Sequence, residues 1–276
     1  MNGTYLSGAT RLAFTDSGAG LPVVFLHPTP LDHDYWRPLT ERLPGVRAIV
    51  PDLRGHGASE LGSSLPAGLF ARVPDAPVLT MTQLAADILA LLDHLELKEA
   101  VFAGCSIGGY VLLELWRQAP QRMRGLAFVC SKPQPDPEAN QAKRVATIAQ
   151  ARATGVDALF DGSMSLIGAT ARKQHPQIAS ELRTRMKLTP EGMVAVQAGL
   201  ATRPDSVATV ATITAPVLAI AGGEDSAVTP ADMEAFRAAP GGCQFHLLPD
   251  AGHFAAYEQQ EKVAGLLSAW LKQGTV

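Results

Sequence analysis

The feature that most constrains the fold is an alternation of short, almost continuous apolar runs with longer segments of helical period. Apolar runs without polar alternation are typical of strands that are buried on both faces of a parallel sheet. Strands that alternate with helices predict a right-handed, doubly wound, mostly parallel α/β sheet. The predicted strands span residues 21–28, 46–52, 100–105, 125–131, 216–223 and 244–250.

Three helices are predicted from the segments between and after these runs. The first covers residues 81–97, with Thr80 or Thr82 as its N-cap, and a second follows the glycine pair 108–109. A last helix is predicted over residues 258–270. The first helix carries its apolar side chains on one face, at Leu84, Ile88, Leu91, Leu92 and Leu95.

One long stretch interrupts the alternation, because residues 133–205 contain several helical patterns and no run of strand type. We therefore expect an α/β core of residues 1–133 and 206–276, with residues 134–205 inserted as a helical cap. A chain of 276 residues is long enough for one large core that carries such an insertion. Residues 60–80, which contain several prolines and glycines, are expected to form an irregular loop.

Charge and cysteine content exclude several classes of function. A formal net charge of -3, from 23 Lys+Arg and 26 Asp+Glu, gives no electrostatic reason for a polyanionic partner, so no nucleic acid is expected. The N-terminus lacks a signal-peptide pattern and no apolar stretch is long enough to cross a membrane, so we expect a cytoplasmic protein without a membrane partner. Cys105, Cys130 and Cys243 are widely spaced, which predicts reduced thiols and no metal site.

The segment from Gly104 to Gly108 places a reactive side chain between a buried strand and a helix. It reads Gly-Cys-Ser-Ile-Gly, and a sharp strand-to-helix turn crowds the positions two residues before and after its central residue. A turn centred on Ser106 puts glycine at both crowded positions, whereas a turn centred on Cys105 puts Ile107 at one of them. Ser106 is therefore the predicted nucleophile, and Cys105 is predicted to be a small buried neighbour.

A serine nucleophile needs a base and a group that orients this base. Of the seven histidines, His253 follows the last predicted strand and precedes the final helix, so it can reach the same sheet edge as Ser106. Asp225 follows the strand before it and is the predicted orienting acid, with the adjacent Glu224 as an alternative. Other histidines have structural interpretations in a helix, a strand, the cap or earlier loops: His94, His246, His175, His27 and His56.

The chain order Ser106, Asp225, His253 is the order found in α/β-hydrolases, and nearly the whole chain resembles that superfamily. In layout it is similar to the small cap-bearing serine hydrolases, which include esterases and 3-oxoadipate enol-lactonases. The resemblance implies a nucleophile elbow, an oxyanion loop and a Ser-Asp-His catalytic triad. Five segments carry it in order: VVFLHPTP, PDLRGHGAS, GCSIGG, GGEDSAVTP and DAGHFAAYE.

The oxyanion loop departs from the family pattern. One oxyanion donor is expected to be the amide of Ile107, the residue after the nucleophile. The other is expected from the loop after the first predicted strand, where the family usually has His-Gly and this chain has His27, proline, Thr29 and proline. Proline has no amide hydrogen, so only His27 and Thr29 can donate from this tetrapeptide. We favour the Thr29 amide as donor and expect His27 to hold the loop.

These assignments predict a serine hydrolase that cleaves carboxylic esters of small to medium acyl groups and needs no cofactor. Ser106 attacks the carbonyl, His253 transfers the proton, and Asp225 holds the imidazole tautomer. Activity should fall as the histidine is protonated, near the reference pKa of about 6.5. Lactone opening, carbon-carbon bond hydrolysis and cofactor-free perhydrolysis use the same core and remain alternatives. A ligand-binding module that barely turns over is the alternative of another class.

The substrate pocket is predicted from aromatic, apolar and basic side chains. Trp36 and Phe254, in loops of the core, are expected to contact substrate. The apolar candidates from the insertion, for which core packing is the alternative, are Met164, Leu166, Ile167, Met186, Leu188 and Met193. The basic candidates for a substrate carboxylate, for which a solvated surface is the alternative, are Arg172, Lys173, Arg183, Arg185 and Lys187.

Overall fold

The computed structural model describes residues 2–273 and contains an eight-stranded sheet with the order β1-β2-β4-β3-β5-β6-β7-β8. Strands β3 to β8 pair with one another in parallel, whereas β1 pairs with β2 and β2 pairs with β4 in antiparallel fashion. The strand bounds are Asn2–Ser7 (β1), Thr10–Gly18 (β2), Leu21–Leu26 (β3), Val46–Pro51 (β4), Ala100–Cys105 (β5), Met123–Val129 (β6), Val217–Gly222 (β7) and Cys243–Leu248 (β8). The predicted doubly wound, mostly parallel α/β fold is confirmed.

The six predicted apolar runs correspond to the parallel strands β3 to β8. Strands β1 and β2 were not predicted, because in both of them buried residues alternate with more exposed ones instead of forming a continuous apolar run. Alternation of this kind is typical of antiparallel strands near a sheet edge, where one face meets water. The hairpin therefore extends the parallel sheet at one side.

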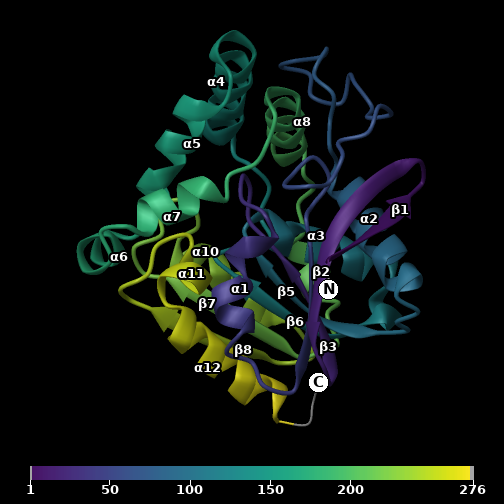
Figure 1. The fold of residues 1–276 in the computed structure, drawn as a ribbon, viewed down its shortest axis with the longest axis vertical. Coiled ribbons are helices and arrows are strands. Elements are labelled where there is room, and N and C mark those ends of the chain that lie inside the picture. The colour runs from purple at the N-terminus through teal and green to yellow at the C-terminus, as the bar shows by residue number, and fades with distance from the viewer. Residues whose placement is uncertain (1, 274–276) are drawn as a thin grey trace.

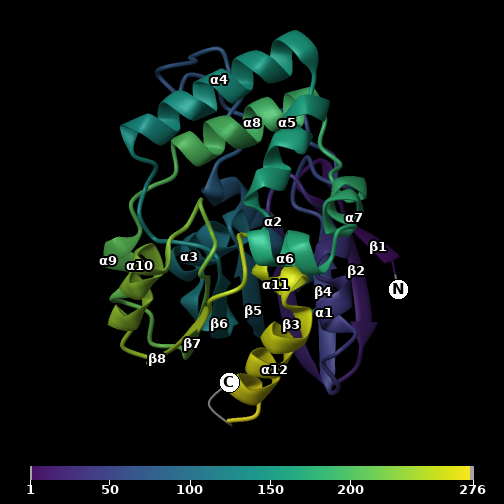
Figure 2. The same ribbon diagram turned by 90° about the vertical axis from the view of Figure 1, so that its left-hand side faces the viewer.

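Helices pack on both faces of the sheet, as Figures 1 and 2 show. Successive residues of one strand point to opposite faces, so Val24 and Leu26 join one hydrophobic cluster while Val23 and Phe25 join the other. The first cluster includes α2 and α3, and the second includes α1 and α12. The bounds of the core helices are Arg37–Thr40 (α1), Met81–His94 (α2), Ile107–Gln118 (α3), Val207–Val210 (α9), Pro230–Met233 (α10), Ala255–Glu258 (α11) and Gln260–Leu271 (α12).

Short 3-10 helices occur at His33–Tyr35, Pro120–Arg122, Met164–Leu166 and Glu234–Ala238. The N-cap of α2 is Thr80, whose side chain accepts a hydrogen bond from the amide of Gln83 at 3.1 Å. This contact decides between the two threonines that the sequence offered. No helix of residues 2–273 combines the length and the apolar character that a membrane crossing requires.

Residues 134–205, called the insertion below, form a group of helices between β6 and β7. Their bounds are Glu138–Thr154 (α4), Asp157–Ser163 (α5), Ala169–Gln174 (α6), Ile178–Thr184 (α7) and Pro190–Ala201 (α8). Helices α4 and α8 lie side by side at one end of the sheet, as both views show. Backbone hydrogen bonds join the insertion to the core, including one from Leu79 N to Ala195 O and one from His253 N to Leu166 O.

Candidate active site

Ser106 occupies a strained turn between β5 and α3. Its backbone has φ 53° and ψ -116°, a conformation that L-residues other than glycine rarely adopt. A Cβ atom at Gly104 would lie 2.5 Å from the carbonyl carbon of Gly108, and one at Gly108 would lie 2.3 Å from the carbonyl oxygen of Leu26. Both positions therefore require glycine, which is the crowding expected for a turn centred on Ser106.

The turn is also supported from the neighbouring strand. The amide of Ser106 donates to the carbonyl oxygen of Val129 at 3.1 Å, and Ser131 Oγ donates to the carbonyl oxygen of Ser106 at 2.9 Å. Gly109 is needed here as well, because a Cβ atom on it would lie 2.3 Å from Ser131 Oγ. The end of β6 thus holds the serine turn in place.

Cys105 points away from the turn into the core. Its side chain is fully buried, and Tyr35 donates its hydroxyl hydrogen to the sulfur at 3.3 Å. Burial raises the pKa of the Cys105 thiol well above its ordinary value, so the thiolate needed for nucleophilic attack is disfavoured. Of these two adjacent residues, Cys105 is buried in the core and Ser106 is the more accessible.

His253 and Asp225 form a buried pair after the last two strands. Asp225 follows β7, His253 follows β8, and His253 Nδ1 lies 2.8 Å from Asp225 Oδ2. The second oxygen, Asp225 Oδ1, accepts hydrogen bonds from the amides of Ala227 at 2.8 Å and Val228 at 3.0 Å. An imidazole whose Nδ1 donates to a carboxylate has Nε2 available as a proton acceptor.

Glu224, the alternative acid, turns toward the insertion. Its Oε2 accepts from the amide of Thr170 at 2.9 Å, and its Oε1 accepts from the Thr170 hydroxyl at 2.5 Å. These hydrogen bonds lower the pKa of Glu224, and the bond from the threonine hydroxyl has the largest effect. The adjacent acids thus have separate partners: Asp225 contacts His253, and Glu224 ties the loop to the insertion.

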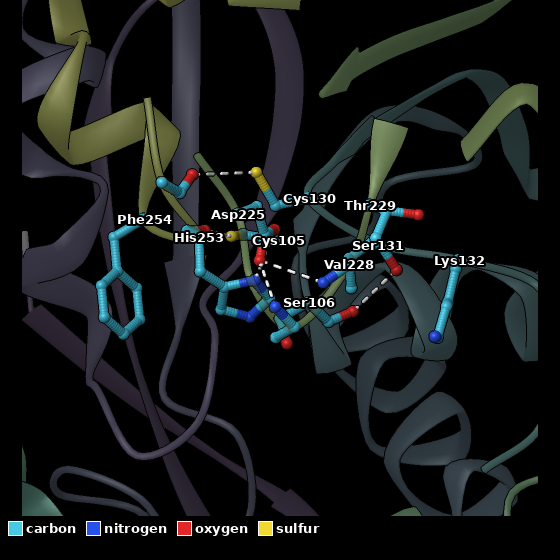
Figure 3. A network of polar contacts seen from close by, with 12 residues as sticks. Cys105, Ser106, Cys130, Ser131, Lys132, Asp225, Val228, Thr229, His253 and Phe254 are labelled. Carbon is cyan, nitrogen blue, oxygen red and sulfur yellow. Dashed lines mark hydrogen bonds and ion pairs between the residues drawn. The ribbon is translucent and has the colours of Figure 1, made fainter. Parts of the chain in front are cut away.

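Ser106 and His253 line one cavity of about 600 Å³ between the sheet and the insertion. Figure 3 shows the imidazole of His253 next to Ser106, with Asp225 behind it. Thr29 lines the same cavity, and of the apolar side chains predicted from the insertion Leu166 and Met193 do so. The cavity therefore combines a hydroxyl and an imidazole with some apolar side chains, an arrangement that can hold the carbonyl group of a substrate.

The two predicted oxyanion donors, the amides of Thr29 and Ile107, are not donors in any turn, loop or cap hydrogen bond of the described residues. Ile107 is the first residue of α3, where backbone amides lack intrahelical partners and carry partial positive charge. Thr29 is held through its hydroxyl, which lies 2.9 Å from His56 Nε2. Neither amide thus has an acceptor among these contacts of the described residues.

The buried side chains of His27 and His56 form hydrogen bonds in and next to the loop that carries Thr29. His27 Nε2 accepts from the amide of Leu53 at 2.9 Å, and His56 Nδ1 lies 3.1 Å from the carbonyl oxygen of Arg54. Burial lowers the pKa of His27 to about 4 and that of His56 to about 3. Both imidazoles are therefore neutral near pH 7, and they act as hydrogen-bonding groups that hold this loop in place.

Trp36 and Phe254, predicted to contact substrate, do not line this cavity. Both side chains are fully buried. Trp36 packs against Phe25 and Tyr35 with ring centroids 5.3 and 5.1 Å away, and Phe254 packs against Tyr35 at 6.3 Å. The prediction is corrected: the loops that carry these rings turn them inward, where burial of large aromatic surfaces stabilises the fold.

The basic residues predicted from the insertion likewise lie outside the cavity. Arg183 pairs with Asp157 and Asp161, and Lys187 pairs with Asp32 at 2.9 Å. The cations that do line the cavity are Lys132, Lys143 and Arg144, which sequence reasoning missed. For Lys132 a signal was present, because it follows β6 at the sheet edge where ligands bind in open α/β sheets.

A second missed residue is Glu258, whose buried side chain forms no ion pair with a lysine or arginine of residues 2–273. Its Oε2 accepts from the amides of Gly168 at 3.0 Å and Gly252 at 2.7 Å, and its Oε1 accepts from the amide of Phe254 at 3.0 Å. Burial raises its pKa, although these three amides favour the ionised form. Within residues 2–273 no group of three or more metal-ligating side chains occurs.

Comparisons with known proteins relate almost the whole chain to hydrolases. A family model described as "Alpha/beta hydrolase family" matches residues 23–266. The chain is 27% identical over 261 residues to 3-oxoadipate enol-lactonase 1 of Acinetobacter baylyi, a match that covers 91% of this chain and 88% of that protein. It is 35% identical over 132 residues to a non-heme chloroperoxidase of Streptomyces lividans, covering 46% of this chain and 43% of that protein.

Among solved structures, a thermophilic esterase from Thermogutta terrifontis, described as malate bound, superposes with a TM-score of 0.89. It is 31% identical in sequence, and the match covers 100% of both chains. An enol-lactonase from Burkholderia xenovorans LB400 superposes with a TM-score of 0.84 at 24% identity, covering 98% of this chain and 100% of that one. This second likeness concerns the fold.

Proposed function

Because the chain belongs to the alpha/beta hydrolase family, we propose that it hydrolyses carboxylic esters of small to medium acyl groups through an acyl-enzyme on Ser106. The observation that carries the proposal is the joint placement of Ser106 and His253 on one cavity, with Asp225 hydrogen-bonded to His253. A hydroxyl, an imidazole that can accept its proton and a carboxylate that orients the imidazole are the groups that acyl transfer to serine requires.

In the proposed reaction, Ser106 Oγ attacks the ester carbonyl while His253 Nε2 takes its proton. His253 then gives this proton to the departing alcohol oxygen, which leaves an acyl group on Ser106. Water attacks the acyl-enzyme in the second half, with His253 again as base, and releases the acid. Asp225 keeps the imidazole in the tautomer that accepts at Nε2 and stabilises the imidazolium that forms in each half.

The negative charge that develops on the carbonyl oxygen is proposed to bind between the amides of Thr29 and Ile107. Neither amide donates elsewhere in the loops and turns of the described chain, so binding costs no existing hydrogen bond. Loss of one such donor typically slows acyl transfer by about 100- to 1000-fold. The position of the Ser106 turn supports this arrangement. Ser106 lies directly before α3, and Ile107, whose amide is the proposed donor, is the first residue of that helix.

Ester hydrolysis is preferred to the alternatives because an esterase is a full-length structural relative at 31% identity. Lactone opening is the second candidate. A lactone is an internal ester that the same steps would open, and a relative at 27% identity over 91% of the chain is named an enol-lactonase. The malate described for the esterase relative is a carboxylate, and the cavity of this chain is lined by cations, so an acidic substrate suits either candidate.

The test is rapid-mixing kinetics with short and medium nitrophenyl esters, on the wild type, Ser106→Ala and Cys105→Ala. We expect a burst of nitrophenol equal to the enzyme concentration, followed by turnover, in the wild type and Cys105→Ala but not in Ser106→Ala. Equal behaviour of wild type and Ser106→Ala would exclude the acyl-enzyme on Ser106. A burst without turnover would instead support the ligand-binding module, because the acyl-enzyme would form but would not be hydrolysed.

A further inference from the structure

The cavity carries a lysine close to the nucleophile turn. After β6 ends at Val129, the chain continues through Ser131, whose hydroxyl donates to the carbonyl oxygen of Ser106 at 2.9 Å, and the next residue is Lys132. The side chain of Lys132 is only 11% exposed, and it lines the same cavity as Ser106 and His253. Figure 3 shows Lys132 next to Ser131, on the side of Ser106 away from Phe254.

The positive charge of Lys132 is only partly neutralised by the nearby carboxylate of Asp232. Among residues 2–273 its one hydrogen-bond partner is Asp232, and the distance from Nζ to Oδ2 is 3.4 Å. The same oxygen also accepts from the amide and the hydroxyl of Thr229, both at 3.0 Å, so the ammonium shares it with two other donors. An ammonium has three donors, and a largely buried one is costly unless these are used.

The remaining charges of the cavity wall reinforce this cation. Lys143 and Arg144, on α4, line the cavity, and Asp136 is the carboxylate among its lining residues. Asp136 is occupied by Arg144 Nε at 3.0 Å and by Arg203 Nη1 at 2.5 Å. Burial opposes its ionisation, but the two arginines hold the pKa of Asp136 below its ordinary value. The cavity wall therefore presents an excess of positive charge, which attracts anions.

We propose that Lys132 forms an anion subsite that binds a carboxylate carried by the substrate, so that the preferred substrates are monoesters of dicarboxylic acids. The proposal rests on the proposed ester hydrolysis at Ser106. The ester carbonyl lies at Ser106 and the free carboxylate of the same molecule meets the Lys132 ammonium, with Lys143 and Arg144 raising the local concentration of anions. Hydrolysis of such a monoester yields a dicarboxylate and an alcohol.

The experiment compares pairs of esters that differ only in charge. Monoethyl succinate, glutarate and adipate are each measured beside the neutral ester in which a carboxamide replaces the free carboxylate, by ethanol release. In the wild type, kcat/KM for the best anionic ester should exceed that of its neutral counterpart by about 10- to 100-fold, the range for a hydrogen bond between charged groups. Lys132→Met should lower this ratio to about 1 by raising KM for the anion, while Lys132→Arg should retain part of it.

Asp232→Asn is the matched control, because it breaks the same ion pair but leaves the lysine. If Lys132 only ties β6 to α10, Asp232→Asn and Lys132→Met will change kinetics alike. If it binds the substrate, Asp232→Asn will keep or increase the preference for the anion. Lys143→Met, which removes an exposed cation farther along the wall, should reduce the ratio less than Lys132→Met does.

Three results would overturn the subsite: a wild-type ratio below about 3, an unchanged ratio in Lys132→Met, or equal effects of Lys132→Met and Asp232→Asn. If Lys132→Met does not fold, Lys132→Gln replaces it, since glutamine keeps a polar donor without the charge. Hydrolysis of the neutral esters that requires Ser106 but shows no anion preference would refute the subsite and leave the ester hydrolase standing. If no ester is hydrolysed, calorimetric titration with adipate still tests the subsite in wild type and Lys132→Met.

Discussion

The buried carboxylate of Glu258 accepts a hydrogen bond from the backbone amide of Gly168, with 3.0 Å between Oε2 and the nitrogen. The same carboxylate holds the amides of Gly252 and Phe254, one on each side of His253. One side chain thus joins the insertion to the loop of the proposed catalytic base. The backbone hydrogen bond from His253 to Leu166 runs between the same two segments.

Replacing this carboxylate should loosen the histidine loop and the insertion together. We expect Glu258→Gln to lower the free energy of unfolding by about 1–3 kcal/mol, because an amide group would place a donor against the amides that the carboxylate now accepts from. Turnover should fall as well, since His253 loses its flanking supports. Urea unfolding and kcat measure the two effects. Glu261→Gln, at an exposed position of α12, is the control, and equal stability of the two variants would refute the argument.

The adjacent acids Glu224 and Asp225 should differ sharply in kinetic effect. Asp225→Asn should reduce kcat by about 10,000-fold, because an asparagine at this position disfavours the imidazole tautomer that accepts at Nε2. Glu224→Gln removes only the contacts with Thr170 and should reduce kcat by less than about tenfold, since the contacts lie outside the proposed reaction path. Steady-state kinetics of both variants with the same ester measure these effects. A larger loss of kcat in Glu224→Gln than in Asp225→Asn would make Glu224 the orienting acid.

Alanine substitutions at two helical glycines should have opposite effects on stability. Gly108→Ala would bring Cβ to 2.3 Å from the carbonyl oxygen of Leu26, so we expect a loss of about 1–3 kcal/mol. Gly265→Ala, in α12, would meet no atom within 4 Å and should stabilise by about 0.5–1 kcal/mol through helix propensity. Thermal unfolding of both variants checks the pair. Equal stability would mean that the turn relaxes around the added methyl group.

Folding stability should decrease as the pH falls below about 6.5. Burial sets the pKa of His27 to about 4 and that of His56 to about 3. Between these values and the ordinary value, the unfolded chain binds protons that the folded protein excludes. Each histidine should therefore cost about 2 kcal/mol between pH 6.5 and 5, where the unfolded chain binds about one proton more per histidine.

Two neighbouring groups act outside this pH window. The Asp52 hydrogen bond raises the pKa of His33, so its contribution is complete below the ordinary pKa and is lost only as the pH rises. Burial opposes the ionisation of Asp52, yet His33 and other partners lower its pKa, so its contribution is lost at more acidic pH. Urea unfolding between pH 5 and about 6.5 tests the slope, which should become shallower in His56→Gln.

Local sequence patterns were sufficient for most of the fold and for the register of the Ser106 turn. Continuous apolar runs predicted β3 to β8, because burial on both faces of a strand constrains every residue of the run. The hairpin of β1 and β2 escaped this criterion, since only one of its faces is buried. The glycines around Ser106 selected the register of the turn, because steric crowding by Cβ depends on residues within a few positions.

The sequence by itself determined the α/β sheet, the serine turn and the order of residues that can meet at its edge. Only the tertiary structure decided which side chains face the cavity. It turned Asp225 rather than Glu224 toward His253, buried Trp36 and Phe254 in the core, and placed a lysine that follows β6 on the cavity that Ser106 lines. The physical reason is that side-chain direction in loops depends on contacts between segments far apart in the chain, which no local pattern records.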